Sequence, residues 1–185
     1  LELLGWIGIC GPVEFVVMPG EYEEWLIAGP IDGVSPTNTV TYRRADGAVD
    51  PVILTPPDTF LYADVPTLSL IGTTGFRFVD LVLRTADDDA EPIVHMREGT
   101  GDNRFESCVF ESYSDDVRAL VVSDGPNSGN RFVSNQFVGG DNGLHLTGWP
   151  SAPQVNTLVQ GNSFQGQREN GANLDYQQSL LFHGN

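Results

Sequence analysis

Aspartate residues that could bind a metal ion recur at the spacing of one sequence repeat along this 185-residue chain. Asp88, Asp115 and Asp141 follow one another at nearly equal intervals. If the repeats stack, this spacing would place the three carboxylates in one column. Such a column of hard oxygen ligands could hold Ca²⁺, and the cation could bridge to an acidic polysaccharide. The alternative is that these residues only cap turns, because carboxylates stacked about 5 Å apart repel one another unless a cation intervenes.

Arginine and tryptophan side chains are further candidates for ligand binding. Arg77, Arg104 and Arg131 recur at equal intervals, one repeat apart. Arg104 and Arg131 could bind an anionic sugar, or they could form surface ion pairs with acidic neighbours such as Glu106. Trp149 is expected in a turn, where an exposed ring could stack against a sugar or against a neighbouring domain.

No catalytic residue is assigned from the sequence. The distances of His95, His145 and His183 from the preceding aligned apolar residue differ, so these histidines need not share a column. We interpret them as residues of a solenoid wall whose ring nitrogens are partly hydrogen-bonded, because no motif with a partnering nucleophile accompanies them. The chain has no Lys, which excludes lysine-dependent chemistry.

Two cysteines occur in the chain, and they are too few for a usual zinc site. Cys108 occupies the position that Asn135 takes one repeat later, so we expect a buried thiol there. A disulfide between Cys10 and Cys108 is an open alternative that no feature of the sequence supports.

Near-copies of one motif indicate the fold that positions these residues. The copies begin at Asn103, Asn130 and Asn156, and a fainter copy begins at Phe76. Within each copy apolar residues alternate with a one-residue offset, a pattern typical of a strand with one buried face. Repeats of about 27 residues that cannot each bury an apolar face predict a solenoid. The predicted fold is all-β, a right-handed parallel β-helix of roughly five coils, with tandem hairpins or a sandwich as the alternative.

Stacked coils place equivalent residues above one another. Phe110, Phe137 and Phe164 are therefore predicted to form one inward stack, and Asn135 is predicted to bond to Asn162 in a ladder. Further strands are expected upstream and between the motif copies, at residues 39–42, 52–54, 68–71, 93–96, 119–122, 143–146 and 179–182.

The beginning of the chain resembles a known family. Residues 11–22 read GPVEFVVMPGEY and residues 31–42 read IDGVSPTNTVTY. These two segments resemble the opening of right-handed parallel β-helix domains in large secreted, surface-associated proteins of Bacteroidetes and their relatives. In that family a short capping helix leads into GPV-x-F-x-V-x-PG-x-Y and then into G-x-S-x-x-N-T-I-T-F. The resemblance covers about residues 3–54 by motif and the remainder by repeat pattern.

The resemblance implies a secreted or cell-surface location. Residues 1–12, with apolar positions on one side of a possible short helix, are expected to cap the solenoid, and residues 13–185 are expected to form it. We expect the chain to be a piece of a longer protein. Pectate-lyase-like and polygalacturonase-like enzymes share the fold, but their catalytic clusters do not appear as a motif, so no catalytic residue is carried over.

The net charge of −16 argues against a nucleic-acid partner, and no apolar run is long enough to span a membrane. The chain is therefore interpreted as a non-catalytic structural, adhesive or glycan-binding segment, with Ca²⁺ as the one cofactor considered. Two alternatives stay open. The first is a polysaccharide lyase or glycoside hydrolase, and the second is a filament subunit that self-associates through the β-helix ends.

Overall fold

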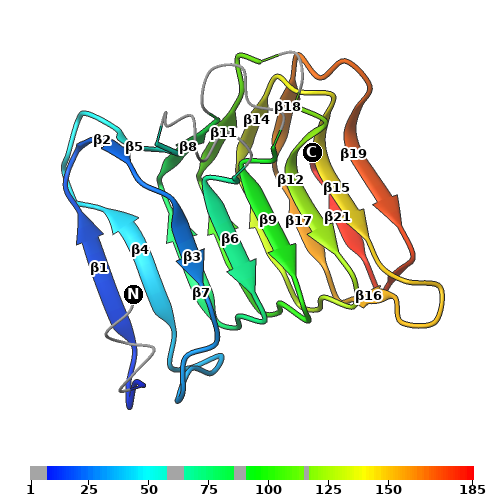
Figure 1. Ribbon diagram of the computed structural model, residues 1–185, viewed down its shortest axis with the longest axis horizontal. Helices are drawn as coiled ribbons and strands as arrows, with labels where there is room; N and C mark the ends of the chain where they lie inside the picture. Colours follow the sequence, from blue (N-terminus) through cyan, green and yellow to red (C-terminus); the bar gives the residue numbers. More distant parts are fainter. Residues whose placement is uncertain (1–7, 58–64, 86–90, 115–116) are drawn as a thin grey trace.

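The chain forms a right-handed parallel β-helix in a computed structural model that describes residues 8–57, 65–85, 91–114 and 117–185 (Figure 1). Each coil passes through three sheets, which we call A, B and C in the order in which the chain meets them. Sheets B and C hold six strands each and sheet A holds seven, so the coils number six, with a seventh begun. The predicted fold is confirmed, with six coils where roughly five were expected, and the irregular first coils also pair in register.

The strands within each sheet are parallel and follow one another from coil to coil. Sheet A contains β1 (Val13–Val17), β4 (Val40–Arg44), β7 (Phe76–Val79), β10 (Arg104–Glu106), β13 (Arg131–Val133), β17 (Leu158–Gln160) and β21 (Leu181–His183). Sheet B contains β2 (Gly20–Glu23), β5 (Val52–Thr55), β8 (Val82–Arg84), β11 (Val109–Glu111), β14 (Gln136–Val138) and β18 (Ser163–Gln165). Sheet C contains β3 (Leu26–Ala28), β6 (Leu68–Ile71), β9 (Val94–Arg97), β12 (Ala119–Asp124), β15 (Asn142–Thr147) and β19 (Asn170–Asp175). A short pair, β16 (Gln154–Val155) and β20 (Gln177–Gln178), lies beyond sheet C.

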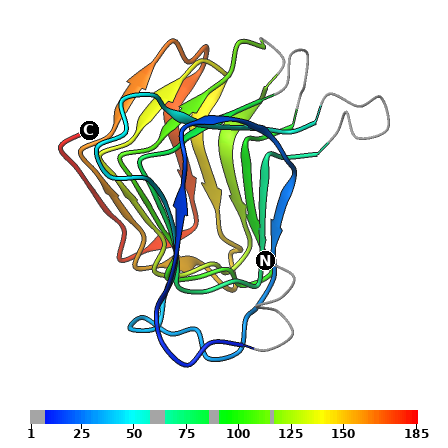
Figure 2. The ribbon, with the colours of Figure 1, turned by 90° about the vertical axis from the view of Figure 1, so that its left-hand side faces the viewer.

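The three sheets enclose an interior (Figure 2). Columns of aromatic side chains fill it. The predicted stack is confirmed, because ring centroids lie 4.9 Å apart between Phe110 and Phe137 and 4.9 Å apart between Phe137 and Phe164. A second column, which the sequence did not reveal in full, runs along sheet A through Phe15, Tyr42, Phe78, Phe105 and Phe132. Burial raises the pKa of the Tyr42 phenol in this column to about 12.

A single residue in the left-handed conformation turns the chain from sheet A into sheet B in the central coils. Ser107 and Ser134 have φ values of 55° and 56° and lie between the two strands of their coils. The one-residue offset in the sequence motif is therefore a corner, and what was expected to be one strand is two. Phe105 points inward from sheet A and Phe110 points inward from sheet B, so both are buried.

The predicted asparagine ladder lies directly after this corner. The Nδ2 group of Asn135 donates to Oδ1 of Asn162 at 3.0 Å, and Nδ2 of Asn162 donates to Oδ1 of Asn185 at 2.9 Å. A second ladder, which was not predicted, joins Asn103 to Asn130 at 3.3 Å. Each ladder supplies hydrogen bonds to backbone groups that a sharp corner would otherwise leave buried and unpaired.

Two expectations about individual segments change, and the expected buried thiol is confirmed. Residues 179–182 were expected in the same sheet as 143–146, but β21 pairs with β17 in sheet A, and β19 takes the expected place. The expected capping helix falls mostly outside the described residues, and residues 8–12 are not helical. Cys108 is buried as expected, which raises the pKa of its thiol to about 12, and neither it nor the exposed Cys10 is in a disulfide.

No helix in the described ranges is both long and apolar enough to cross a membrane.

Truncation of the central phenylalanine should strongly destabilise the fold. We expect Phe137→Ala to lower the free energy of unfolding by about 3–5 kcal/mol, since the ring is fully buried between two stacked rings. Val138→Ala, on the outward side of the same strand, should cost less than about 1 kcal/mol. Urea denaturation of both variants measures the difference, and equal losses would contradict the stacked core.

Extension of the asparagine ladder by one coil should stabilise the protein. Asn135 accepts the N–H of Cys108 at 2.9 Å and donates to the carbonyl of Phe105 at 3.1 Å. In the unchanged protein the N–H of Leu81 and the carbonyl of Phe78 lie against the Cys108 thiol. An asparagine at position 108 could accept a hydrogen bond from that N–H and donate one to that carbonyl. We expect Cys108→Asn to add about 1 kcal/mol to the free energy of unfolding and Cys108→Ala to lower it. Thermal melts in which both variants are destabilised by the same amount would show that the ladder does not extend.

Candidate functional site

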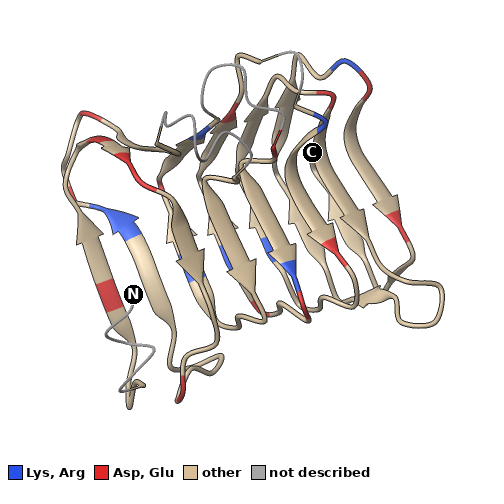
Figure 3. Ribbon diagram, viewed as in Figure 1, with Lys and Arg blue, Asp and Glu red and all other residues tan. Residues whose placement is uncertain are grey.

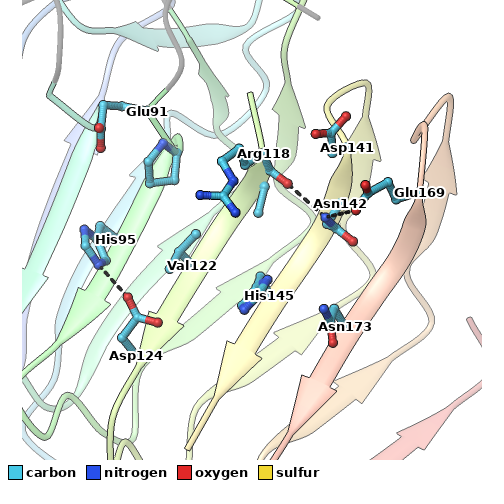
Figure 4. A pocket seen from close by; sticks show the side chains of 12 residues that line it. Glu91, His95, Arg118, Val122, Asp124, Asp141, Asn142, His145, Glu169 and Asn173 are labelled. Carbon is cyan, nitrogen blue, oxygen red and sulfur yellow. Dashed lines mark hydrogen bonds and ion pairs between the residues drawn. The ribbon is translucent and has the colours of Figure 1, made fainter. Parts of the chain in front are cut away.

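A groove of about 500 Å³ crosses the outer face of sheet C (Figure 4). Its floor is one row of residues in register on four adjacent strands: His95 on β9, Val122 on β12, His145 on β15 and Asn173 on β19. Strands in a sheet lie about 4.8 Å apart, so this row is about 14 Å long. The groove therefore runs along the solenoid axis, across coils that are far apart in sequence.

Strand alternation explains why these side chains face outward. On β9 the neighbours of His95 are Val94 and Met96, and both are fully buried. On β15 the neighbours of His145 are Leu144 and Leu146, which are also buried. Because successive side chains of a strand point to opposite faces, burial of the apolar residues leaves both imidazoles on the outer face.

His95 and Asp124 form a fixed pair at one side of the groove. Nε2 of His95 lies 3.1 Å from Oδ2 of Asp124, the last residue of β12. This hydrogen bond, together with the electrostatic influence of the two imidazoles, lowers the pKa of Asp124 below its ordinary value although partial burial opposes the shift. Asp124 is therefore a carboxylate at neutral pH, suited to accept hydrogen bonds and unsuited to donate a proton.

Polar side chains at the opposite side of the groove are held by contacts between neighbouring coils. The Nε group of Arg168 donates to Oδ1 of Asp141 at 2.5 Å. The Nδ2 group of Asn142 donates to Oε2 of Glu169 at 3.3 Å, and Nδ2 of Asn170 donates to Oδ1 of Asn142 at 3.1 Å. These bonds fix the positions of the carboxylates before any ligand binds.

Three groove side chains make no side-chain hydrogen bond or ion pair within the described residues: Arg118, His145 and Asn173. The guanidinium of Arg118 points into the middle of the groove (Figure 4). Guanidinium groups donate, amides donate and accept, and a neutral imidazole does both. These available groups therefore offer both kinds of hydrogen bond to a ligand.

The groove is acidic. Four carboxylates line it, on Glu91, Asp124, Asp141 and Glu169, against the single guanidinium of Arg118. With both histidines counted as neutral, and with Arg168, which pairs with Asp141, included, these six groups give the groove a formal charge of −2. A negatively charged ligand would meet repulsion here.

Trp149 lies near Asp124, which stands at one side of the groove. It is 56% exposed in the turn that follows β15, where its backbone N–H and carbonyl both bond to Ala152 at 3.0 Å. Its ring packs 3.4 Å from the point where a Cβ would stand on Gly125, the residue after Asp124. The prediction of an exposed ring in a turn is confirmed, whereas its role as a sugar-stacking platform stays a prediction.

Of the three aspartates in the predicted calcium column, only Asp141 lies among the described residues. Asp88 and Asp115 lie outside the described residues. Asp141 lies at the edge of the groove and pairs with Arg168. Within the described ranges, no group of three or more His, Cys, Asp or Glu residues is placed to hold a metal ion. The calcium site therefore stays a prediction.

The predicted arginine row forms on a different face. Arg77, Arg104 and Arg131 are in register on β7, β10 and β13 of sheet A, and Arg104 pairs with Glu106 at 2.9 Å. Their alignment and this ion pair were both expected. Ligand binding by Arg104 and Arg131 stays a prediction.

The structure places two of the three histidines in one row on the solenoid wall. His95 and His145 do share one row, with Val122 between them, whereas His183 lies in sheet A. Their sequence separations gave no sign of this, because Val122 follows His95 by one full repeat but His145 follows Val122 by clearly less. The loops between strands vary in length from coil to coil, so register in sheet C does not follow the repeat. A useful signal was the apolar alternation around each histidine.

Comparison with known proteins identifies the fold. Neither a protein-family model nor a curated protein matches the chain. Among solved structures, the chain is similar to the pectin methylesterase from Aspergillus niger, in the crystal structure of its deglycosylated form. The TM-score is 0.52 at 14% sequence identity, over 99% of this chain and 80% of that one. A likeness at this identity establishes the β-helix fold alone.

The Asp124–His95 pair should contribute stability that depends on pH. Because the pKa of Asp124 is lowered in the folded protein, its contribution is present above the ordinary value of 3.8 and is lost as the pH falls through the lowered value. We expect Asp124→Asn to lower the free energy of unfolding by less than about 1 kcal/mol at pH 6, since the pair is partly exposed. At the lowest pH at which the protein stays folded, the substitution should leave the free energy of unfolding unchanged.

The matched control is Asp175→Asn, at the equivalent end of β19, where no ion pair forms within the described residues. Chemical denaturation of both variants at several pH values measures the effect. A loss for Asp124→Asn that stays constant with pH would contradict the assignment.

Proposed function

We propose that this chain is a glycan-binding β-helix that holds a neutral polysaccharide along the groove of sheet C. The observation that carries the proposal is the row of available polar side chains across adjacent coils. Arg118, His145 and Asn173 lie in one groove, between carboxylates fixed by Arg168 and His95. A sugar chain presents hydroxyl groups at repeated intervals, and each hydroxyl can both donate and accept.

The charge of the groove supports a neutral ligand. A groove with a formal charge of −2, on a chain of net charge −16, disfavours a polyanion. Neutral or fully esterified glycans escape this repulsion. Trp149, exposed near Asp124, offers a ring face on which a sugar could stack.

In this proposal residues 13–185 act as one rigid binding unit of a secreted or cell-surface protein, with residues 1–12 covering its first coil. A rigid solenoid suits this role, because the groove residues are fixed by their strands and lose little freedom on binding. Repetition of the unit on a larger protein would convert weak single-site binding into strong attachment.

Cleavage of the bound glycan or of its ester groups is the second candidate function. It is favoured by the His95–Asp124 pair, in which a carboxylate orients an imidazole within reach of the groove floor. The structurally similar protein is a pectin methylesterase, so β-helices of this kind can support ester hydrolysis. The lowered pKa of Asp124 weighs against its service as a general acid for glycoside cleavage.

A blocking substitution tests the site. Val122→Arg places a long charged side chain on the groove floor between the two histidines, at an outward and half-buried position. We expect the unchanged protein to bind neutral glycans such as xylan, galactan or fully methyl-esterified pectin more tightly than polygalacturonate. Val122→Arg should weaken that binding at least about tenfold in isothermal titration calorimetry.

Val109→Arg is the matched control, because Val109 is an outward, half-buried residue on β11 of the same coil but in sheet B. It should bind as the unchanged protein does. Equal binding by both variants would place the glycan elsewhere, and a panel without any bound neutral glycan would refute the proposal. Release of methanol, reducing ends or unsaturated products that stops in His95→Ala would establish the enzyme instead.

A further inference from the structure

A row of arginines crosses sheet A, on a different sheet from the glycan groove. Arg77, Arg104 and Arg131 are paired in register on three adjacent strands. Each alternates with an inward phenylalanine of the aromatic column, so all three guanidinium groups emerge on the outer face. Neighbouring members of the row stand one strand spacing apart, about 4.8 Å at the backbone.

This concentration of positive charge stands out in an acidic chain. The chain has nine basic residues against 25 acidic ones, and three of the nine occupy this row. Arg104 forms an ion pair with Glu106, whereas Arg77 and Arg131 form none within the described residues. Like charges at one strand spacing repel one another, so an anion between them would relieve an unfavourable interaction.

The arginines also line a small hollow. It has a volume of about 140 Å³ and is closed by Pro36, Thr39 and Asp102. The carboxylate of Asp102 makes no ion pair with the arginines, so it does not neutralise the row directly. Three guanidinium groups set against the carboxylates of Asp102 and Glu106 leave the site with a formal charge of +1.

A buried donor in the middle of the row lacks an acceptor. The Nε atom of Arg104 is inaccessible to solvent and has no hydrogen-bond partner in the described structure. Buried N–H groups are nearly always paired in folded proteins, so the hydrogen-bonding capacity of Arg104 is incompletely used in the described structure. Planar guanidinium groups bind oxyanions with paired hydrogen bonds, and they do so better than isolated ammonium groups.

We propose that this hollow is an oxyanion-binding site, built for a sulfate, phosphate or carboxylate group held between Arg77, Arg104 and Arg131. The anion could be a substituent of an acidic glycan or a free inorganic ion, since both present the same oxygens. The site is separate from the sheet C groove, and the two surfaces differ in the sign of their charge.

Calorimetry at low ionic strength tests the site with four probes: sodium sulfate, sodium phosphate, the sulfated galactan carrageenan, and polygalacturonate. We expect Arg131→Gln to weaken the binding of every probe that the unchanged protein binds, by about tenfold or more. Added NaCl should weaken the same binding through screening. Binding of carrageenan or polygalacturonate much tighter than of sulfate would identify a glycan substituent, and binding of the free ions alone would identify an inorganic ligand.

Two further variants serve as controls. Arg97→Gln removes the same charge from an exposed position at the end of β9 and should leave oxyanion binding unchanged. Arg131→Lys retains the charge without the planar fork, and we expect an intermediate affinity. Circular dichroism verifies that each variant is folded.

The Val122→Arg variant of the groove should bind the oxyanion probes normally, so failure of the groove proposal is distinguishable from failure of this one. Two results would overturn the oxyanion site. The first is no binding of any probe by the unchanged protein, and the second is equal loss in Arg131→Gln and Arg97→Gln.

Discussion

In-register stacking of coils is the constraint on which the rest of this structure depends. No coil encloses a core of its own, because its inward residues are covered mainly by the equivalent residues of the coils before and after it. Identical side chains stacked at one strand spacing satisfy this requirement well. Phe137 lies between two rings, and Asn135 bonds to the asparagine of the next coil. The same geometry that buries phenylalanine therefore also pairs the polar groups of the corners.

The stacking also organises the surface into rows. Any outward residue stands beside its counterparts in the neighbouring coils. One polar position in each coil therefore gives a row of polar side chains along the solenoid. Sheet C presents histidine, arginine and amide groups in an acidic groove, and sheet A presents a row of arginines. Two sheets of one solenoid thus carry different chemistry, because each row is set by one residue position per coil.

The distribution of charge follows the same logic. Many acidic residues lie at strand ends and in turns, where they remain hydrated (Figure 3). Several arginines bridge adjacent coils through carboxylates: Arg43 to Glu14, Arg44 to Asp80, Arg84 to Glu111 and Arg168 to Asp141. The arginines without such partners in the described ranges include those of the groove and of the small hollow. We infer that the bridging pairs serve mainly to join coils, whereas the guanidinium groups that form no bridge between coils are available to ligands.

The sequence by itself determined the fold, the Phe110–Phe137–Phe164 stack and the Asn135–Asn162 ladder, because sheets A and B repeat at a nearly constant interval and the pattern is local. It also aligned the arginine row for the same reason. Only the tertiary structure decided the groove. Its row joins residues at unequal intervals along the chain, since loops of unequal length precede the strands of sheet C. Pairing of backbone groups, and not spacing along the chain, brings His95 and His145 into one row.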